Sequence, residues 1–491
     1  MIHSIANART HAGNVAVKTA SGKYTYQDLL DRSSQIAADL LNGRQHLNEA
    51  RIAFIMNPGF EYVATQWGIW RAGGVAVPLC VKHPFVSLQY VIEDTAAEQL
   101  IYTEEYQELI APFESFKNLG LKEYHSIGSE IGQLPEVDST QRAMILYTSG
   151  TTGKPKGVVT THDNLAAQVS SLVEAWQWTA EDQILNVLPL HHIHGILNAT
   201  CCPLSVGACV EFLDQFDPEA VFKAFLGGDV NIFMAVPTIY FKLVNVWKEY
   251  SEVQKQEVLD KLSQFRFMVS GSAALPVSVL EEWRGISGQT LLERYGMTEI
   301  GMAISNPYDG ERRPGYIGKP LPGVGVRLFD ESGEVVEEGV PGEIQIKGPT
   351  VFQEYWEKPE ATAESFTEDG WFKTGDTAVI EDGYYRILGR NSVDIIKSGG
   401  YKISALEIEE VLRKYAGIKD CGVVGLPDDE WGEIIGAGLI ADEKSLDMNQ
   451  MNAWLREQLP NYKIPRKYVF LEDLPRNVMG KVTKKELKTL F

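Results

Sequence analysis

The first two-thirds of the chain alternate short apolar runs, rich in β-branched residues, with longer amphipathic stretches. Arg51–Met56 (RIAFIM) is followed by a helical pattern over 62–73 and then by the apolar run GVAVPL at 74–79. Runs of the same kind return further along the chain, at 99–103, 143–148, 182–190, 231–237 and 265–271. Short strands separated by helices are typical of parallel α/β sheets. We therefore predict an α/β fold whose large N-terminal domain consists of layered sheets.

The pattern changes twice in the last third. From Gly315 onward, runs with glycine-containing turns at 323–330, 342–348 and 382–390 predict an antiparallel, β-rich subdomain. After Arg390 a new alternation begins, with expected helices at 405–415 and 451–459 and expected strands at 421–427 and 436–441. We predict a domain boundary near Asn391, so that residues 1–390 form the N-terminal domain and residues 391–491 form a small α+β C-terminal domain.

Charge and cysteine content limit the partners. The formal net charge is -21, which argues against nucleic acid or an anionic membrane as a partner, although local cations can still bind small anions. The five cysteines are odd in number and two are adjacent, which favours reduced thiols over a disulfide framework. The least charged run, Ile193–Val210, contains Pro203 and Gly207 and is not expected to span a membrane. The N-terminus has no apolar signal core, and we predict a cytoplasmic protein. The sequence does not report the oligomeric state.

A glycine- and hydroxyl-rich segment, ILYTSGTTGKPKGVV at 145–159, follows one of the apolar runs. Backbone N–H groups that converge in such a loop bind anions, and hydroxyls and lysines add donors and positive charge. The segment is not a Walker A loop, because Pro155 follows the Gly153–Lys154 pair. A surface loop without a ligand is the alternative. The candidate phosphate-binding residues are Thr148, Ser149, Gly150, Thr151, Thr152, Gly153, Lys154 and Lys156.

Six further segments follow in order: LPLHHIHG (188–195), SGSAALP (270–276), ERYGMTE (293–299), WFKTGD (371–376), GRNSVDIIKSGGYKIS (389–404) and LPRNVMGKV (474–482). With the glycine-rich loop they resemble the adenylate-forming superfamily, which includes acyl-CoA synthetases, luciferases and adenylation domains. The resemblance covers essentially the whole chain. It implies an ATP-dependent ligase that joins a carboxylate to AMP, releases pyrophosphate, and transfers the acyl group to a thiol such as that of CoA.

The resemblance also implies roles for single residues. Lys481 would stabilise the adenylation transition state, and His192 and Thr298 would share the catalytic site. Thr148 and Glu299 would hold Mg²⁺ through oxygen. Asp376 would accept hydrogen bonds from the ribose, assisted by Arg390. The remaining residues expected at the nucleotide are Gly271, Ser272, Ala273, Tyr295 (stacked on adenine), Gly296 and Met297.

In this superfamily the small domain rotates between the two half-reactions. The resemblance then places Ser398, Gly399 and Gly400 toward the CoA thiol and the hinge at Ser392, where many relatives carry Asp or Lys. His192 would lie at the gate between the acid and the thiol, with a packed, uncharged histidine as the alternative. His191, His192 and His194 do not suggest a zinc site, because no ligands from separate segments accompany them.

Arg294 is the residue that predicts which class of acid the protein binds. Its neighbours in ERYGMTE are expected at the nucleotide and the metal, so Arg294 is expected beside the acyl pocket, where a buried guanidinium needs an anion. A dicarboxylate supplies one, because its second carboxylate can pair with Arg294. Lys242 is a candidate second cation, Ser305 a candidate hydroxyl donor, and His192 also borders this pocket. The alternative for Arg294 is a salt bridge to Glu293 or Glu299.

The segments around Arg294 and His192 resemble those of malonyl-CoA synthetases in particular, with methylmalonate as a usual second substrate. Relatives often carry arginine where this chain has Lys242. We therefore expect an ATP- and Mg²⁺-dependent malonate–CoA ligase. The alternatives are a short-chain monocarboxylate ligase, an adenylation enzyme that loads a carrier protein, and a nucleotide-binding regulatory protein that has lost catalysis.

Overall fold

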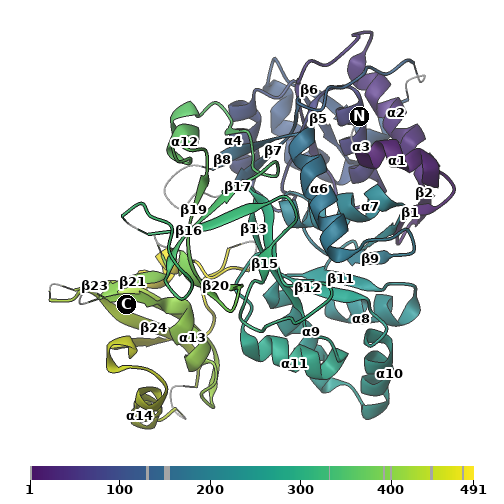
Figure 1. Cartoon of the computed structure of the whole chain (residues 1–491). Helices are drawn as coiled ribbons and strands as arrows, with labels where there is room; N and C mark the ends of the chain where they lie inside the picture. Colours follow the sequence, from purple (N-terminus) through teal and green to yellow (C-terminus); the bar gives the residue numbers. More distant parts are fainter. Residues whose placement is uncertain are drawn as a thin grey trace.

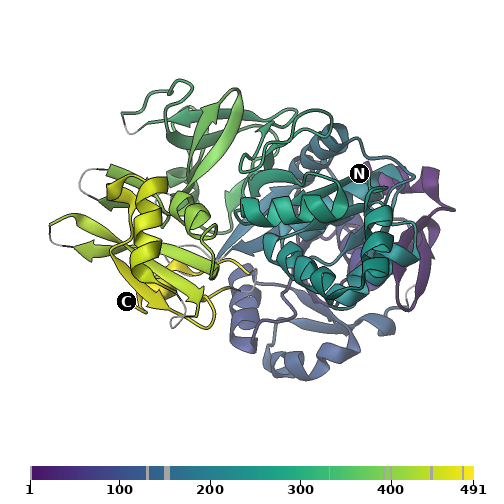
Figure 2. The ribbon, with the colours of Figure 1, turned by 90° about the horizontal axis from the view of Figure 1, so that it is seen from below.

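A computed structural model describes residues 3–128, 132–148, 155–330, 332–390, 393–398, 401–428, 430–442, 446–477 and 480–491. A large N-terminal domain of mixed α/β sheets is followed by a small C-terminal domain, which is coloured yellow-green to yellow in Figure 1 and lies at one end of the molecule in both views (Figures 1 and 2). The predicted fold class is confirmed.

One mixed sheet carries most of the candidate site. Among the described residues it has the order β15-β14-β13-β12-β11-β9-β10-β1-β2. The inner strands from β13 to β1 are parallel, and β14, β15 and β2 add antiparallel edges. Its strands are β1 (Val15–Thr19), β2 (Gly22–Thr25), β9 (Gln183–Asn186), β10 (Cys209–Phe212), β11 (Ile232–Ala235), β12 (Phe267–Ser270), β13 (Leu292–Met297), β14 (Gly301–Ser305) and β15 (Lys319–Pro320).

A second sheet has the order β18-β8-β7-β4-β3-β5-β6 in the described part of the chain. Here β7 pairs with β8 in antiparallel fashion, and the glycine-rich segment connects the two strands. The sequence predicted parallel sheets and did not predict the antiparallel strand β8, because apolar runs do not reveal strand direction. The strands are β3 (Arg51–Ile55), β4 (Val75–Pro78), β5 (Gln99–Tyr102), β6 (Gly120–Glu123), β7 (Arg142–Thr148), β8 (Lys156–Thr161) and β18 (Glu354–Tyr355).

Two further sheets complete the described strands. The antiparallel sheet predicted after Gly315 is present and consists of β16 (Gly325–Phe329), β17 (Gly342–Lys347), β19 (Phe372–Glu381) and β20 (Tyr384–Arg390). The sheet of the C-terminal domain consists of β21 (Ile395–Ser398), β22 (Tyr401–Ser404), β23 (Ile418–Asp428), β24 (Gly432–Ala441) and β25 (Lys467–Phe470).

Helices cover the sheets, and several begin with side-chain caps. Thr161 at the start of α6 accepts a hydrogen bond from the backbone N–H of Asn164, whose side chain accepts one in return. The longer helices are α2 (Tyr26–Leu41), α3 (Phe60–Arg71), α4 (Phe85–Thr95), α6 (His162–Trp176), α8 (Pro218–Gly227), α9 (Pro237–Glu249), α10 (Glu252–Leu262), α11 (Val277–Ser287), α13 (Ala405–Leu412) and α14 (Met448–Gln458). The shorter ones are α1 (His3–Ala8), α5 (Gln107–Ile110), α7 (Cys202–Val206), α12 (Pro359–Glu364), α15 (Lys484–Lys488), and the 3-10 turns η1 (Arg9–His11), η2 (Glu104–Tyr106), η3 (Ala111–Ser115), η4 (Tyr124–Ser126) and η6 (Asn461–Lys463).

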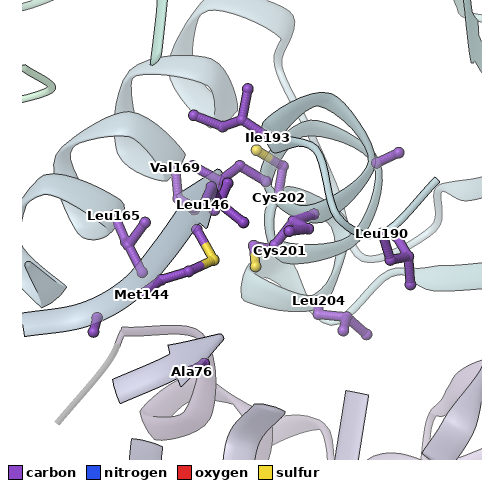
Figure 3. Close-up of a cluster of buried hydrophobic side chains, with 14 of the residues drawn as sticks. Ala76, Met144, Leu146, Leu165, Val169, Leu190, Ile193, Cys201, Cys202 and Leu204 are labelled. Atoms are coloured by element: carbon purple, nitrogen blue, oxygen red, sulfur yellow. The ribbon is translucent and has the colours of Figure 1, made fainter. Parts of the chain in front are cut away.

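The weakly charged run at 193–210 forms a π-helix, η5 (His194–Cys201), followed by α7 and β10. Cys201 and Cys202 belong to the buried core that also contains Met144 of β7 and Leu165 of α6 (Figure 3). The cysteines of the chain are all buried and unpaired. Within the described residues, no helix combines the length and apolarity that a membrane span requires.

The C-terminal domain contacts the N-terminal domain at several points. The backbone N–H of Val277, at the start of α11, donates to the Glu410 carboxylate at 3.3 Å. Gly480 (φ +76°) packs against Thr238 at the start of α9, where an added Cβ would lie 2.9 Å from the Thr238 hydroxyl oxygen. The short loop that carries Lys481 therefore lies against the N-terminal domain.

Candidate active site

The candidate site forms where parallel strands of the large sheet end. Loops that follow neighbouring parallel strands meet at the same edge of a sheet, which is the usual place for a ligand. Gly271, Ser272 and Ala273 follow β12, Thr238 follows β11, and Arg294 and Tyr295 lie on β13. The predicted motifs SGSAALP and ERYGMTE therefore meet in space.

Arg294 is buried, with 4% of its surface exposed. Its Nη2 donates a hydrogen bond to the Ser272 hydroxyl at 3.1 Å, and an added Cβ on Gly271 would lie 2.4 Å from the guanidinium carbon. Burial lowers the pKa of Arg294 to about 9, so it is charged at neutral pH. Among the described residues no carboxylate forms a salt bridge with Arg294, and its buried Nε–H has no hydrogen-bond partner.

The two acids expected to compete for Arg294 have other partners. Glu293 accepts a hydrogen bond from the backbone N–H of Gly315 at 3.0 Å, and burial raises its pKa to about 8. Glu299 accepts a hydrogen bond from the Tyr355 hydroxyl at 3.0 Å. The alternative of an internal salt bridge from Arg294 to either acid is therefore wrong for this structure. Arg294 is therefore a buried charge without a protein counter-ion among the described residues, and its role toward the acid stays a prediction.

Asp376 on β19 lies at the expected nucleotide side. One of its oxygens accepts a hydrogen bond from the Tyr295 hydroxyl at 2.7 Å, and the other accepts one from Nε of Arg390 at 2.9 Å. The stacking of Tyr295 on adenine stays a prediction, and the structure shows that the Tyr295 hydroxyl holds Asp376 by a hydrogen bond. Gly296 follows in β13, where an added Cβ would lie 2.2 Å from the Gly301 carbonyl oxygen, so only glycine fits.

The expected metal ligands lie on adjoining elements. Met297 ends β13, and Thr298 and the buried Glu299 follow in the turn before β14. Lys156 pairs in register with Thr148, and its Nζ lies 4.8 Å from the centre of the Tyr355 ring. Burial raises the pKa of Glu299, while the charges of Arg390 and Lys156 act in the opposite direction. A carboxylate and a hydroxyl are hard oxygen donors that suit Mg²⁺. Ser149, Gly150, Thr151, Thr152, Gly153 and Lys154 lie outside the described residues.

Lys481 reaches this site from the C-terminal domain. Burial and the charge of Arg390 lower its pKa, as does the charge of Arg294, and Asp376 opposes them. Lys481 is exposed to solvent, and the protein groups around it are still close enough to lower its pKa. Lys481 therefore lies close enough to Asp376 and Arg390 for their charges to act on its pKa.

His192 lies close enough to Lys481 for the charge of the lysine to act on it. Burial lowers the pKa of His192 to about 4, and the charge of Lys481 adds to the effect. Its ring centre is 4.0 Å from that of His191, and its Nε2 is buried without a partner in the described residues. His192 is therefore neutral at physiological pH, which fits both the predicted gate and the packed, uncharged alternative. No group of three or more metal-binding side chains occurs in the part of the chain that the structure describes.

Two residues expected at the acid pocket have other surroundings. Lys242 is exposed on α9, and its Nζ lies 5.6 Å from the centre of the Phe216 ring, not beside Arg294. The buried stripe of α9 includes Tyr240 and Leu243, which leaves residue 242 on the solvent side. Ser305 is paired with Arg294 in register, but its hydroxyl donates to the Asn306 carbonyl (2.8 Å) and accepts from Trp176 (3.1 Å).

The expected CoA-facing segment lies on the C-terminal sheet. Ser398 ends β21, is buried, and pairs with Tyr401 and Gly432. Gly399 and Gly400, and also the expected hinge Ser392 with Asn391, lie outside the described residues.

Comparison with models of protein families identifies the family to which the chain belongs. The family model described as AMP-binding enzyme matches residues 5–356, and the one described as AMP-binding enzyme C-terminal domain matches residues 407–481. The chain belongs to the AMP-binding enzyme family.

Several relatives of this AMP-binding enzyme have named activities. It is 45% identical to the mitochondrial malonate–CoA ligase ACSF3 of Xenopus laevis, over 96% of this chain and 88% of that protein. Its structure is similar to that of ATP-bound MatB from Rhodopseudomonas palustris, with a TM-score of 0.91 at 33% identity over 99% of this chain and 98% of the other. A malonyl-CoA ligase ternary product complex with methylmalonyl-CoA and AMP gives a TM-score of 0.71 at 35% identity, over 97% and 100% of the two chains.

The sequence did not single out His194 for the acid side of this AMP-binding enzyme. Its Nδ1 lies 3.3 Å from the Ser272 hydroxyl oxygen, which also contacts Arg294. The expected position of Ser272 at adenine stays a prediction, and the structure shows that its hydroxyl accepts a hydrogen bond from Arg294. The sequence feature that could have indicated His194 is its place as the third histidine of LPLHHIHG. Only the fold, however, brings η5 against the loop after β12.

Proposed function

We propose that the protein is an ATP-dependent malonate–CoA ligase, which forms malonyl-AMP with release of pyrophosphate and then transfers the malonyl group to CoA. The observation that carries the proposal is the buried, charged Arg294 without a carboxylate partner among the described residues. One carboxylate of malonate would react with ATP, and the other would pair with Arg294. At about 4 Å and an effective dielectric constant near 20, such a pair is worth on the order of 4 kcal/mol before desolvation.

Adenylation requires one anion to attack another, so positive charge at the α-phosphate lowers the barrier. We assign this role to Lys481, which lies close enough to Asp376 and Arg390 for their charges to shift its pKa. Asp376, held by Tyr295 and Arg390, would accept the ribose hydroxyls. We propose that His192 and Thr298 complete the catalytic site.

The remaining nucleotide contacts are proposed on the same basis. Gly271, Ser272, Ala273, Gly296 and Met297 would border the nucleotide, and the loop at 148–153 with Lys156 would bind the phosphates. Glu299 and Thr148 would hold Mg²⁺, which when bound neutralises phosphate charge.

The second half-reaction needs a different domain orientation. We propose that the C-terminal domain, from about Asn391, rotates at Ser392 and brings Ser398, Gly399 and Gly400 toward the CoA thiol. The docking of Lys481 at the nucleotide site supports an adenylation-competent orientation here. The greater structural similarity to ATP-bound MatB than to the product complex, at nearly equal identity, also supports it.

The choice between malonate and methylmalonate depends on a single methyl group, which is worth only about 1–3 kcal/mol in a pocket. A short monocarboxylate leaves Arg294 without a counter-ion, and a regulatory protein would have no need of Lys481 at the nucleotide site. We also propose that the protein acts in the cytoplasm, although the Xenopus laevis relative is named as mitochondrial.

A substrate panel tests the proposal. Pyrophosphate exchange would be measured with malonate, methylmalonate, acetate and octanoate, and product formation would be compared with CoA and with a carrier protein as thiol donor. We expect malonate or methylmalonate to be the best acid and CoA the best thiol. Higher activity with acetate or octanoate would rule out the dicarboxylate assignment, and a preference for the carrier protein would rule out the CoA assignment.

A further inference from the structure

The C-terminal domain meets the start of helix α11 in the N-terminal domain. The Glu410 side chain, on α13, accepts a hydrogen bond from the backbone N–H of Val277 at 3.3 Å. Val277 is the first residue of α11, and Pro276 before it has no side-chain group that could cap the helix. The first backbone N–H groups of a helix have no partner within the helix. Glu410 therefore supplies, from the other domain, an acceptor that α11 lacks.

The surroundings of Glu410 favour its charged form at this position. Helix α11 has no acidic residue in its first turn, and a carboxylate is stabilised at a helix N-terminus by the partial positive charge of the backbone. Burial raises the pKa of Glu410, whereas the charge of Arg413 and the hydrogen bond from Val277 lower it. Nη1 of Arg413 lies 3.6 Å from one Glu410 oxygen, and the Val277 N–H donates to the other. Both oxygens of the carboxylate therefore have a partner.

The other acid that acts on this contact is Glu293 in β13. Burial and the charge of Glu410 raise the pKa of Glu293 to about 8, and its side chain accepts a hydrogen bond from the backbone N–H of Gly315. Glu293 is therefore mostly protonated at neutral pH. Glu410 can approach the N-terminal domain without a second negative charge to repel it.

A second contact of the same domain lies at the neighbouring helix. Gly480 packs against Thr238, the second residue of α9, and α9 and α11 pack against each other. Helix α9 follows β11 and helix α11 follows β12, so both helices begin at the edge of the sheet where the candidate site lies. The C-terminal domain thus rests on two adjacent helix starts, with the loop of Lys481 at one and Glu410 at the other.

We propose that Glu410 is a positioning residue that holds the C-terminal domain in the orientation for adenylation by capping α11 across the domain boundary. Rotation of the domain separates Glu410 from Val277, so the contact favours one orientation over the other. This inference rests on the proposed function, because it concerns the two half-reactions assigned there. Glu410 is assigned no contact with the acid, the nucleotide or CoA, and it acts through the position of Lys481.

Two substitutions remove the contact from opposite sides. Glu410→Ala removes the acceptor. Val277→Pro removes the donor N–H, and proline suits the first position of a helix when the residue before it is extended, as Pro276 is with ψ 130°. Val277→Ala keeps the N–H and is the matched control. We expect Glu410→Ala and Val277→Pro each to slow single-turnover adenylation by about 3- to 10-fold, and Val277→Ala to change it by less than about twofold.

A change in domain orientation has a signature that a folding defect lacks. Thioester formation from supplied acyl-adenylate is expected to stay unchanged or to become faster in both variants. Domain orientation is measured by energy transfer between dyes on cysteines introduced at the exposed Glu257 and Glu457, since the native cysteines are buried. We expect each variant to shift the equilibrium between orientations by about 3- to 10-fold away from that of the wild type. The double variant Glu410→Ala/Val277→Pro is expected to show no larger shift than either single variant, because both remove the same contact.

Three outcomes would overturn the proposal: unchanged orientation and adenylation in Val277→Pro, equal slowing of both half-reactions, or effects that multiply in the double variant. If one variant does not fold, the other decides alone. The assays use the acid that the wild type prefers, so their outcome does not depend on malonate being the substrate. A wild type without acid-dependent pyrophosphate exchange would instead refute the proposed function.

Discussion

Nη1 of Arg476 donates a hydrogen bond to the carbonyl oxygen of Gly480 at 2.9 Å, directly before Lys481. The same guanidinium forms an ion pair with Asp420 on β23. Asp420 in turn pairs with Arg413 at 3.0 Å. Arg476 therefore fixes the loop that carries Lys481 to the sheet of the C-terminal domain.

Arg476→Ala is expected to slow adenylation by about 10-fold, because a small displacement of a positioned group is costly for catalysis. Thioester formation from supplied malonyl-adenylate is expected to change little, since we assign Lys481 to the adenylation step alone. Single-turnover kinetics of the two half-reactions measure both effects. Arg456→Ala, at an exposed position of α14, is the control. An equal loss in both half-reactions would show a general folding defect instead.

Lys481→Ala is expected to lower the adenylation rate by about 10²- to 10³-fold, the usual loss when a group that stabilises transition-state charge is removed. Thioester formation from malonyl-adenylate is expected to be largely retained. Lys485→Ala removes an exposed lysine nearby and serves as the matched control. If Lys481→Ala slows adenylation and thioester formation to the same extent, the assignment of Lys481 to adenylation alone is contradicted.

Arg294→Leu is expected to lower kcat/KM for malonate by tens- to hundreds-fold, because the distal carboxylate loses its buried counter-ion. The KM for ATP is expected to be unchanged. Lys242→Leu removes an exposed cation on α9 and tests the role expected for it from the sequence. We expect little change in malonate kinetics from this variant. Unchanged kinetics in Arg294→Leu would remove Arg294 from the acid pocket.

Glu293→Gln is expected to change how stability depends on pH. The pKa of Glu293 in the folded protein is about 8, raised by burial from about 4.5, so between these values the folded state holds a proton that the unfolded chain has lost. The free energy of unfolding therefore falls as pH rises through this window, by ~1.4 kcal/mol for each unit of pKa shift.

Glutamine cannot ionise and can still accept the hydrogen bond from Gly315. We expect Glu293→Gln to have a higher Tm than the wild type at pH 8.5 and a similar Tm near pH 4.5, measured by calorimetry. Glu257→Gln, at an exposed position, is the control and is expected to show no such difference. Equal Tm values for Glu293→Gln and the wild type at both pH values would contradict an unfavourable ionisation of Glu293.

Much of the fold could be predicted from the sequence. The run RIAFIM became β3, DGYYRILGR became β20, and ALEIEEVLRKY began α13, because apolar periodicity and glycine-containing turns act locally. The antiparallel partner β8 was missed, since strand direction depends on how distant segments pair.

For the candidate site, too, some residues could be predicted from the sequence and others could not. Glu299, Asp376 and Lys481 were found from motifs, in which residue type and spacing report the chemistry, and their roles remain predictions. Lys242 was expected beside Arg294 and lies on the exposed side of α9. His194 was considered only as a metal ligand, and its Nδ1 lies 3.3 Å from the Ser272 hydroxyl oxygen. Spacing along the chain does not say which face of a helix meets a loop from another strand.

The sequence by itself determined the family, the alternation of short strands and helices, and the residues available for binding ATP and an acid. The tertiary structure decided that Arg294 is buried without a protein counter-ion among the described residues, and that Ser272 connects it to His194. The reason is physical: local sequence sets backbone preference and side-chain chemistry, whereas burial and hydrogen-bond partners depend on segments that meet only when the sheets assemble.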